Sequence, residues 1–333
     1  MNITFNEHFV EPKIIGNGNF GTVYQVNYKI DNQLYAIKKI PLNDVMLEKE
    51  LTKDDVLRLI NQEVEMLMKI AKNGNKYVVQ YYHHWCESSL KKDKVSNDVY
   101  YIQMELCSQS LDDVIQAINS LRNEKSNDIL KDRQSYIYDI KIVINFLCGQ
   151  LFRETVECVN YLHKSEPKII HRDLKPQNIL VVGNVVNNRF LKLCDFNMSK
   201  AHEWSTMSNT SRVGTFKYTA PEVLNGHKYN TMADIYSLSF IAQDLFQVDI
   251  YGSEEGTDPM ACLKKLLAQM IDHFFEDRPK CSEILVRQNE WLINEETVKC
   301  LTFIKLIKDK LLNENNRFLY QYLLHHLSKQ SQH

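Results

Sequence analysis

The sequence predicts an α+β protein of two lobes, a sheet-rich lobe followed by a mainly helical one. Its 333 residues exceed what one compact hydrophobic core usually holds. Apolar and polar residues alternate in short runs over residues 10–40, which is typical of strands. Over much of the second half, apolar residues recur at helical spacing. We therefore expect an antiparallel sheet first and a helical lobe behind it.

The first lobe is expected to span residues 1–107, as a five-stranded antiparallel sheet plus one helix. The helix is predicted over residues 54–70, where Val56, Ile60 and Val64 share one stripe behind two acidic residues suited to a first helical turn. A polar stretch at 87–98 predicts an exposed hairpin loop between the last two strands. The expected strands are three within 10–40, one over 78–85 and one over 99–106.

The second lobe is expected to span residues 108–294, with a helical extension over 295–333 packed on it. Polar residues 123–134 have the composition of a surface insertion. Short strands are expected over 168–170 and 189–194. The predicted helices of this lobe and its extension are 111–121, 136–163, 232–246, 260–273, 281–291, 296–312 and 318–327.

Charge and cysteine usage narrow the class of protein. Forty Lys and Arg stand against 42 Asp and Glu, a net charge of -2, so no nucleic-acid surface is expected. None of the eight cysteines forms a C-x-x-C pair, which argues against zinc ribbons and thioredoxin-like motifs. No stretch is apolar enough for a membrane span. We expect a cytoplasmic protein, with a nuclear location left open.

Residues 16–23, GNGNFGTV, place three glycines between two predicted strands. Glycine lets a backbone close over phosphates because it has no Cβ. A dinucleotide fold needs a helix directly after the glycines, whereas TVYQV continues as a strand. In isolation, a glycine-rich turn without function would be the better explanation of this fragment.

Lys38 on the third strand supplies a cation that can reach phosphate oxygens. A carboxylate must hold this cation, and we favour Glu63, which lies beside the packing stripe of the predicted helix. Glu65 is two residues further and points about 200° away around the helix. An isolated charge of this kind usually lies on a solvated face.

Residues 171–180, HRDLKPQNIL, carry the strongest signal. They put an acceptor carboxylate (Asp173), an ammonium group (Lys175) and a metal-binding amide (Asn178) on one short loop. Asp195 follows a predicted strand and offers a second metal-ligand carboxylate. An Ala-Pro-Glu run ending at Glu222 comes later in the chain, and we expect its glutamate to pair with Arg278.

In the order of these motifs, the chain resembles the eukaryotic protein kinases from about residue 9 to residue 291. The resemblance implies a bilobal kinase fold and an ATP- and Mg²⁺-dependent serine/threonine kinase. It further implies that Lys38, paired with Glu63, holds the α and β phosphates and that Asp173 accepts or orients the substrate hydroxyl proton. Lys175 would steady the γ phosphate, while Asn178 and Asp195 would hold Mg²⁺.

The resemblance also implies the nucleotide site. Met104 takes the place of the gatekeeper, and residues 105–107 form the hinge, with Glu105 and Cys107 beside the adenine. Glycines of the loop would cover the phosphates, and apolar side chains would line the adenine slot. The implied residues are Gly16, Gly18 and Gly21 over the phosphates and Ile15, Val23, Ala36 and Leu180 around the adenine.

Asn197 departs from the family pattern, which has glycine at this place in Asp-Phe-Gly. Asparagine tolerates positive φ better than most other residues, and Asp195 is retained. We therefore expect activity, with an ATP-binding pseudokinase scaffold as the alternative. The following segment is rich in hydroxyls, and we predict phosphorylation at Thr210 or Ser211, where a phosphate could pair with Arg172.

Several kinase subfamilies share features with this chain, and none dominates. Residues 78–85 and 101–107 resemble kinases of translation initiation factor two, and the first run also resembles Wee-type kinases. Residues 105–111 and the tail after Trp291 are similar to Ire-type kinases. The expected partner is a protein substrate with a serine or threonine acceptor, with no nucleic acid and no membrane span. A homodimer that phosphorylates its own activation segment is left open.

Overall fold

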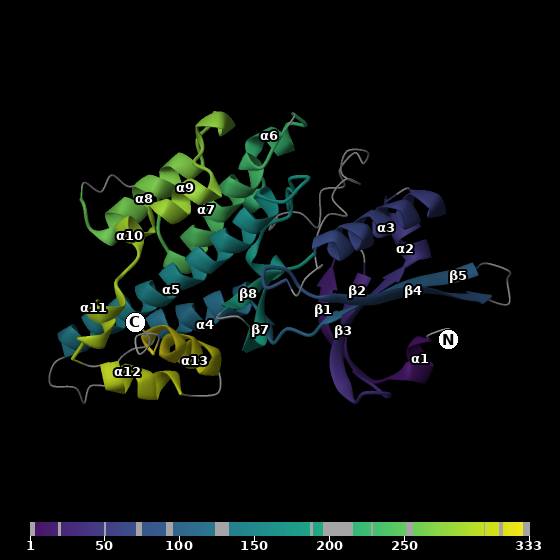
Figure 1. Ribbon diagram of the computed structural model, residues 1–333, viewed down its shortest axis with the longest axis horizontal. Coiled ribbons are helices and arrows are strands. Elements are labelled where there is room, and N and C mark those ends of the chain that lie inside the picture. Colours follow the sequence, from purple (N-terminus) through teal and green to yellow (C-terminus); the bar gives the residue numbers. More distant parts are fainter. Residues whose placement is uncertain are drawn as a thin grey trace. The chain divides into compact units, whose positions relative to one another are not determined.

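The computed structural model divides into two compact units (Figure 1). The N-terminal unit comprises Met1–Ser108, Val182–Asn187 and Lys192–Asn209, and the C-terminal unit comprises Gln109–Val181, Asn188–Leu191 and Thr210–His333. The described residues are 4–18, 21–49, 51–70, 75–90, 96–123, 133–186, 189–195, 216–227, 229–250, 256–302, 304–312 and 316–328.

A five-stranded antiparallel sheet forms the N-terminal unit, as predicted, with the strand order β1-β2-β3-β5-β4. One side of the sheet buries aromatic residues, including Phe9 and Tyr101. The strands are β1 (Phe9–Gly18), β2 (Gly21–Tyr28), β3 (Gln33–Pro41), β4 (Tyr81–Leu90) and β5 (Ser96–Glu105).

The predicted helix of this unit is α3 (Lys53–Ile70). Its residues Val56, Ile60 and Val64 are buried in a cluster with Ile40 and Ile102 of the sheet. The apolar stripe therefore serves to hold the helix on the strands. The structure adds two shorter helices that the sequence did not indicate, α1 (Phe5–His8) and α2 (Leu42–Lys49).

The expected loop at 87–98 is wrong over most of its length. β4 continues to Leu90 and β5 begins at Ser96, with Glu87 paired to Val99 in the ladder. Polar side chains suit a strand whose outer face meets water, so composition alone did not distinguish the two states. Residues 91–95 lie outside the described part. The strand expected from residue 78 begins at Tyr81, and Val78 forms an isolated parallel bridge with Leu193.

Helices dominate the C-terminal unit, also as predicted. Helix α5 (Arg133–His163) packs against α7 (Met232–Phe246) and α9 (Cys281–Val286). A short sheet has the order β6-β7-β8, and β7 from Val182 and β8 from Lys192 are counted with the N-terminal unit. Its strands are β6 (Gln109–Ser110), β7 (Ile179–Val186) and β8 (Arg189–Leu193), and the other helices before the tail are α4 (Leu111–Asn123), α6 (Pro221–Leu224), α8 (Pro259–Met270) and α10 (Gln288–Trp291).

Two predictions for this unit are wrong. Residues 168–170 are not a strand, because the backbone N–H of Ile169 donates to the carbonyl of Leu162 at the end of α5. The helix expected over 281–291 divides at Arg287, whose ψ of 8° leaves the helical range. Residues 124–132 of the expected surface insertion lie outside the described part.

The C-terminal extension holds three helices, α11 (Glu295–Lys299), α12 (Ile304–Leu311) and α13 (Arg317–Leu327), so the helix expected over 296–312 is in two pieces. All three pack against α5, and Figure 1 shows them in yellow beside it. Leu319, Tyr322 and Leu323 of α13 are buried.

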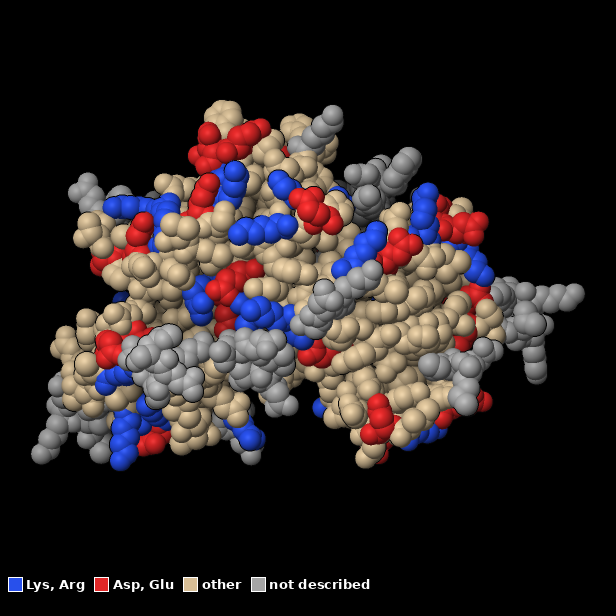
Figure 2. All heavy atoms as spheres, in the orientation of Figure 1, with Lys and Arg blue, Asp and Glu red and all other residues tan. Residues whose placement is uncertain are grey.

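All eight cysteines are free thiols. Within the described residues, no helix has the length and apolarity needed to cross a membrane. Figure 2 shows basic and acidic side chains interspersed on the visible face, in keeping with the near-neutral net charge.

Candidate active site

The glycine motif forms the end of the β1–β2 hairpin, where Gly18 pairs with Gly21 and Gly16 pairs with Val23. Gly21 has a φ of +156°, and a Cβ there would lie 2.0 Å from the carbonyl oxygen of Lys39. At Gly16 a Cβ would meet only the Cβ of Val23, at 3.9 Å. Gly21 is therefore required by the close approach of β3, whereas Gly16 leaves open space beside the strand.

Lys38 lies on β3 and is almost fully buried, with 5% of its surface exposed. Its Nζ is 2.6 Å from Oδ1 of Asp195, and Asp195 adopts a left-handed backbone with a φ of 61°. Both residues belong to the N-terminal unit. The backbone of Glu63 lies in α3, but its side chain is outside the described part, so the predicted Lys38–Glu63 pair stays a prediction.

The residues of the N-terminal unit that are predicted to line the adenine slot lie on neighbouring strands. Ala36 is buried and pairs with Met104 across β3 and β5, while Val23 pairs with Lys38 across β2 and β3. Ile15 on β1 is 44% exposed. Leu180 belongs to the C-terminal unit, where it lies on β7 and pairs with Ser110 of β6.

The predicted hinge residue Glu105 is fixed by a partner that the sequence analysis missed. Oε2 of Glu105 accepts hydrogen bonds from Lys192 Nζ at 2.6 Å and from the backbone N–H of Gln80 at 3.1 Å. The backbone N–H of Glu105 in turn donates to the carbonyl of Gln80 at 2.8 Å. Lys192 is a lysine within the apolar run of β8, and a charge in a buried strand could have signalled a buried partner.

Cys107, the other predicted hinge residue, is a protonated thiol. Burial raises its pKa to about 12, the carboxylate of Glu105 acts in the same direction, and Lys192 opposes both. The side chain therefore contributes no charge to the hinge at neutral pH.

The predicted catalytic loop brings its three residues together in the C-terminal unit. Asn178 lies in a short 3₁₀ turn, η1 (Pro176–Asn178), and its Nδ2 donates to the carbonyl and to Oδ2 of Asp173, at 2.7 and 3.0 Å. Lys175 Nζ lies 2.9 Å from the same Oδ2. No hydrogen bond reaches Oδ1 of Asp173 from the described residues. One oxygen of this carboxylate is thus held and the other is available to a ligand.

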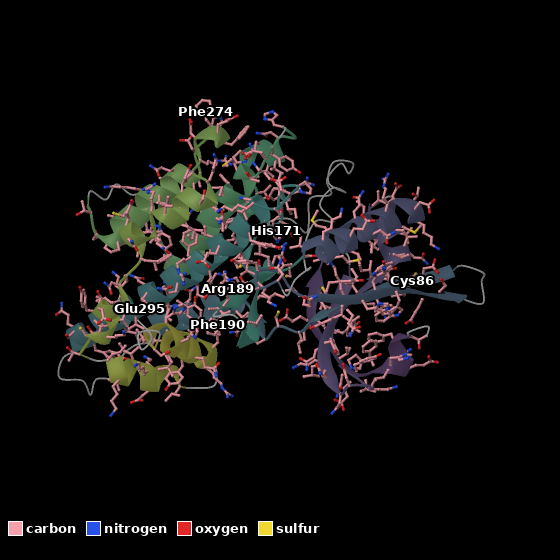
Figure 3. All side chains as sticks on the ribbon, viewed as in Figure 1. Cys86, His171, Arg189, Phe190, Phe274 and Glu295 are labelled. Carbon is pink, nitrogen blue, oxygen red and sulfur yellow. The ribbon has the colours of Figure 1, made fainter. Side chains whose placement is uncertain are left out.

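Asp234 organises this loop, a role that sequence reasoning did not assign. Its carboxylate accepts from the backbone N–H groups of His171 and Arg172, at 2.9 and 3.0 Å, and from Nε2 of His163 at 2.8 Å. Burial alone would raise the pKa of Asp234, but His163 and His171 lower it below its ordinary value. Figure 3 labels His171, which is fully buried.

Arg172 follows His171 with a strained backbone, at a φ of 71°. Its guanidinium lies 5.4 Å from the ring centre of Tyr229. Within the described part of the chain, its buried Nε has no hydrogen-bond partner. The predicted phosphorylation sites Thr210 and Ser211, and also Asn197, lie outside the described residues.

Glu222 and Arg278 form the predicted ion pair. Arg278 Nη1 and Nη2 lie 2.6 and 3.0 Å from the two carboxylate oxygens, a bidentate geometry, and both residues are buried. Arg278 also donates to the carbonyl of Met232 at the start of α7. The pair therefore joins the segment after the catalytic loop to the helical core.

A cavity of about 550 Å³ opens in the C-terminal unit between α4, α7 and the turn η3 (Phe216–Tyr218). Lys217 and Tyr218 both bond Asp244 on its wall. Burial raises the pKa of Tyr218 well above its ordinary value, and the bond to Asp244 adds to the effect. Two residues of its wall, Lys217 and Tyr218, come just before the Ala-Pro-Glu run in the sequence.

Comparison with known proteins agrees with this geometry. The protein kinase domain family matches residues 9–326. The interferon-induced, double-stranded RNA-activated protein kinase of Mus musculus is 27% identical over 319 residues, which cover 87% of this chain and 52% of that protein. The MAP kinase kinase mkk-4 of Caenorhabditis elegans is 31% identical over 232 residues, covering 69% of this chain and 53% of that protein.

A further relative is the eukaryotic translation initiation factor 2-alpha kinase 1 of Rattus norvegicus, 36% identical over 159 residues, or 44% of this chain and 23% of that protein. The chain spans about half the length, or less, of these relatives. It belongs to the protein kinase family, and it resembles serine/threonine kinases and stress-response kinases.

Proposed function

We propose that the chain is a catalytically active kinase that transfers the γ-phosphate of ATP to serine or threonine hydroxyls of a protein. The arrangement around Asp173 carries this proposal. Lys175 and Asn178 both bind Oδ2, so the carboxylate is oriented while Oδ1 can accept the proton of a substrate hydroxyl. A scaffold that only binds nucleotide would need no such arrangement.

Asp173 would hold the substrate hydroxyl in line with the γ phosphate and take its proton as the new P–O bond forms and the bond from the γ phosphorus to the departing ADP breaks. Lys175, already beside Asp173, would neutralise charge on the γ phosphate. Asp234 would maintain the loop by bonding the backbone N–H groups just before Asp173. The protein needs no nucleophilic side chain because positioning and charge stabilisation dominate phosphoryl transfer.

The residues present fit ATP and Mg²⁺. Asp195 and Asn178 provide carboxylate and amide oxygens, the hard ligands that Mg²⁺ prefers. When bound, the metal would neutralise phosphate charge. Lys38 is buried and charged beside Asp195, which suits an ammonium that binds α and β phosphates, and the open space beside Gly16 accommodates phosphates next to the strand.

Phosphorylation of the activation segment is part of the same proposal. Arg172 offers a buried Nε donor on a strained backbone directly before Asp173. A phosphate on Thr210 or Ser211 would supply an acceptor for it and order the segment. Peptide mapping of the purified active enzyme should find this modification, and an active enzyme unmodified over residues 205–215 would contradict it.

The test of activity is radiolabelled phosphate transfer from ATP to a general acceptor protein. Asp173→Ala should lower the transfer rate by about 10²- to 10⁴-fold while ATP still binds. Lys38→Met should also abolish most transfer. Lys39→Met is the matched control, since adjacent strand residues face opposite sides, and it should keep the wild-type rate.

The competing function is a pseudokinase scaffold, for which the only observation is Asn197 in place of glycine. Equal and negligible transfer by wild type, Asp173→Ala and Lys38→Met, with ATP bound by the wild type, would establish the scaffold instead.

A stress or cell-cycle signalling role is the finer proposal, and the similarity to an interferon-induced kinase and to a translation initiation factor 2-alpha kinase favours the stress role. The alpha subunit of translation initiation factor two is the acceptor to compare with the general protein. Selective transfer to it would support the initiation-factor pathway. A cytoplasmic location and self-association during activation complete the proposal.

A further inference from the structure

Helix α13 buries one tyrosine hydroxyl in the C-terminal unit. Tyr322 is fully buried, and its OH donates to Oε1 of Glu154 on α5 at 3.0 Å. Glu154 is itself 1% exposed. A buried hydroxyl bonded to a buried carboxylate is costly to assemble unless every group is bonded, so this contact is more than apolar filling.

The other oxygen of Glu154 binds the beginning of β8. Oε2 accepts from the backbone N–H of Phe190 at 3.0 Å and of Leu191 at 3.2 Å. Arg189 Nη2 donates to the backbone carbonyl of Glu154 at 2.8 Å. Burial alone would raise the pKa of Glu154, but His326, the Phe190 N–H and Arg189 lower it, so the group is a carboxylate at neutral pH.

Aromatic contacts join α13 to the same point of the strand. The ring of Phe190 lies 4.7 Å from that of Tyr322 and 5.8 Å from that of Phe318, both edge-on. Figure 3 labels Arg189 and Phe190 at the start of β8, near α13 in Figure 1. The first residues of β8 are therefore held by both α5 and α13.

We propose that Tyr322 is a positioning residue for the metal-binding segment. By orienting Glu154, its hydroxyl fixes the backbone of Phe190 and Leu191, and β8 ends two residues before Asp195. The inference rests on the proposed role of Asp195 as a Mg²⁺ ligand. The C-terminal helix thus acts on the backbone of β8 that leads into Asp195 and not only through the stability of the unit.

The test uses the full chain with Tyr322→Phe, which removes the hydroxyl and keeps the ring beside Phe190. Tyr320→Phe makes the same change on the same helix, and no hydrogen bond involves the Tyr320 side chain in the described structure. Amide hydrogen exchange of Phe190 and Leu191 should become about fivefold faster in Tyr322→Phe and stay unchanged in Tyr320→Phe.

The second readout is the Mg²⁺ concentration for half-maximal binding of a fluorescent ADP analogue. It should rise about two- to fivefold in Tyr322→Phe alone. A lower unfolding temperature with unchanged exchange and unchanged Mg²⁺ dependence would reduce Tyr322 to a structural residue and overturn the inference. Glu154→Gln keeps the side-chain shape and should likewise speed the amide exchange and raise the Mg²⁺ concentration for half-maximal binding. This variant takes the place of Tyr322→Phe in the test if Tyr322→Phe fails to fold.

These outcomes separate the inference from the proposed function. A wild-type protein that binds the ADP analogue with Mg²⁺ but transfers no phosphate would refute the kinase activity. The hydrogen-exchange and Mg²⁺ measurements would still test the role of Tyr322. A wild type whose nucleotide binding ignores Mg²⁺ would refute the role of Asp195 and the inference with it.

Discussion

Gly16 and Gly21 belong to one glycine motif but have different surroundings. Only Gly21 faces the β3 backbone, at a distance that no side chain can share. Gly21 is therefore required for the packing of β2 against β3, whereas Gly16 lies beside open space.

We predict that Gly21→Ala lowers the free energy of unfolding by about 1–3 kcal/mol, because its Cβ must displace the carbonyl of Lys39. Gly16→Ala should change it by less than about 0.5 kcal/mol. Urea unfolding of both variants measures the difference, and equal effects would contradict the packing argument.

Asp234 is the buried carboxylate that holds the predicted catalytic loop, and its stabilising contribution depends on pH. Its pKa in the folded protein lies below the ordinary value of 3.8, so the unfolded chain binds the proton more readily. The stabilisation is therefore complete well above pH 3.8 and is lost as pH falls through the folded-state pKa.

Asp234→Asn should lower the free energy of unfolding by about 2–4 kcal/mol at pH 7, because it removes the charge that three donors bind. The difference in the free energy of unfolding between this variant and the wild type should become smaller below about pH 4. Asp309→Asn, an exposed change on α12, should follow the wild type at every pH. A difference that stays constant from pH 7 to pH 3.5 would exclude this account.

At the scale of elements, β8 is bonded to the predicted hinge at the end of β5. The pair of Lys192 and Glu105 is mostly buried, with side-chain exposures of 7% and 20%. The backbone of Leu193 is bonded on both sides, to Val79 and to Tyr77, at 2.9 Å each. The strand before Asp195 and the hinge therefore share one hydrogen-bonded segment, residues 77–80.

We expect Lys192→Met and Glu105→Gln each to cost about 2–4 kcal/mol of stability, because each leaves a partly buried charged or polar partner behind. The double variant should cost about 1–2 kcal/mol less than the sum of the two. Chemical denaturation of the four proteins gives this coupling energy. Additive effects would show that the two side chains do not interact.

At the scale of the whole molecule, the C-terminal extension is part of the core of its unit. Tyr322 and Leu323 are fully buried, and α11, α12 and α13 all pack on α5. The unfolding of the C-terminal unit should therefore respond to changes in the tail.

Leu323→Ala should lower stability by about 2–5 kcal/mol, since it opens a cavity in a packed interior. Leu312→Ala, at a side chain that is 53% exposed, should stay within about 0.5 kcal/mol of wild type. Scanning calorimetry compares the two. If the C-terminal extension were not part of the core, both substitutions would lower stability by a similarly small amount.

Sequence patterns predicted the elements whose signal is local. Patterns within one segment were enough to predict α3 from its apolar stripe, β1 to β3 from their alternation of apolar and polar residues, and α7 from its apolar residues. The loop assigned to 87–98 failed because solvent-facing strand residues and loop residues have the same composition. The strand assigned to 168–170 failed because a short apolar run does not reveal its hydrogen-bond partner.

The sequence by itself determined the chemical inventory and the family, because the spacing within residues 171–180 and the order of the motifs are properties of the chain. It could also pair Glu222 with Arg278. Only the tertiary structure decided that Gly21 must clear β3, that Asp234 holds the catalytic loop, and that Tyr322 reaches Glu154. These contacts join residues that are distant in the sequence, and their importance depends on how deeply the groups are buried. A local sequence pattern contains neither kind of information.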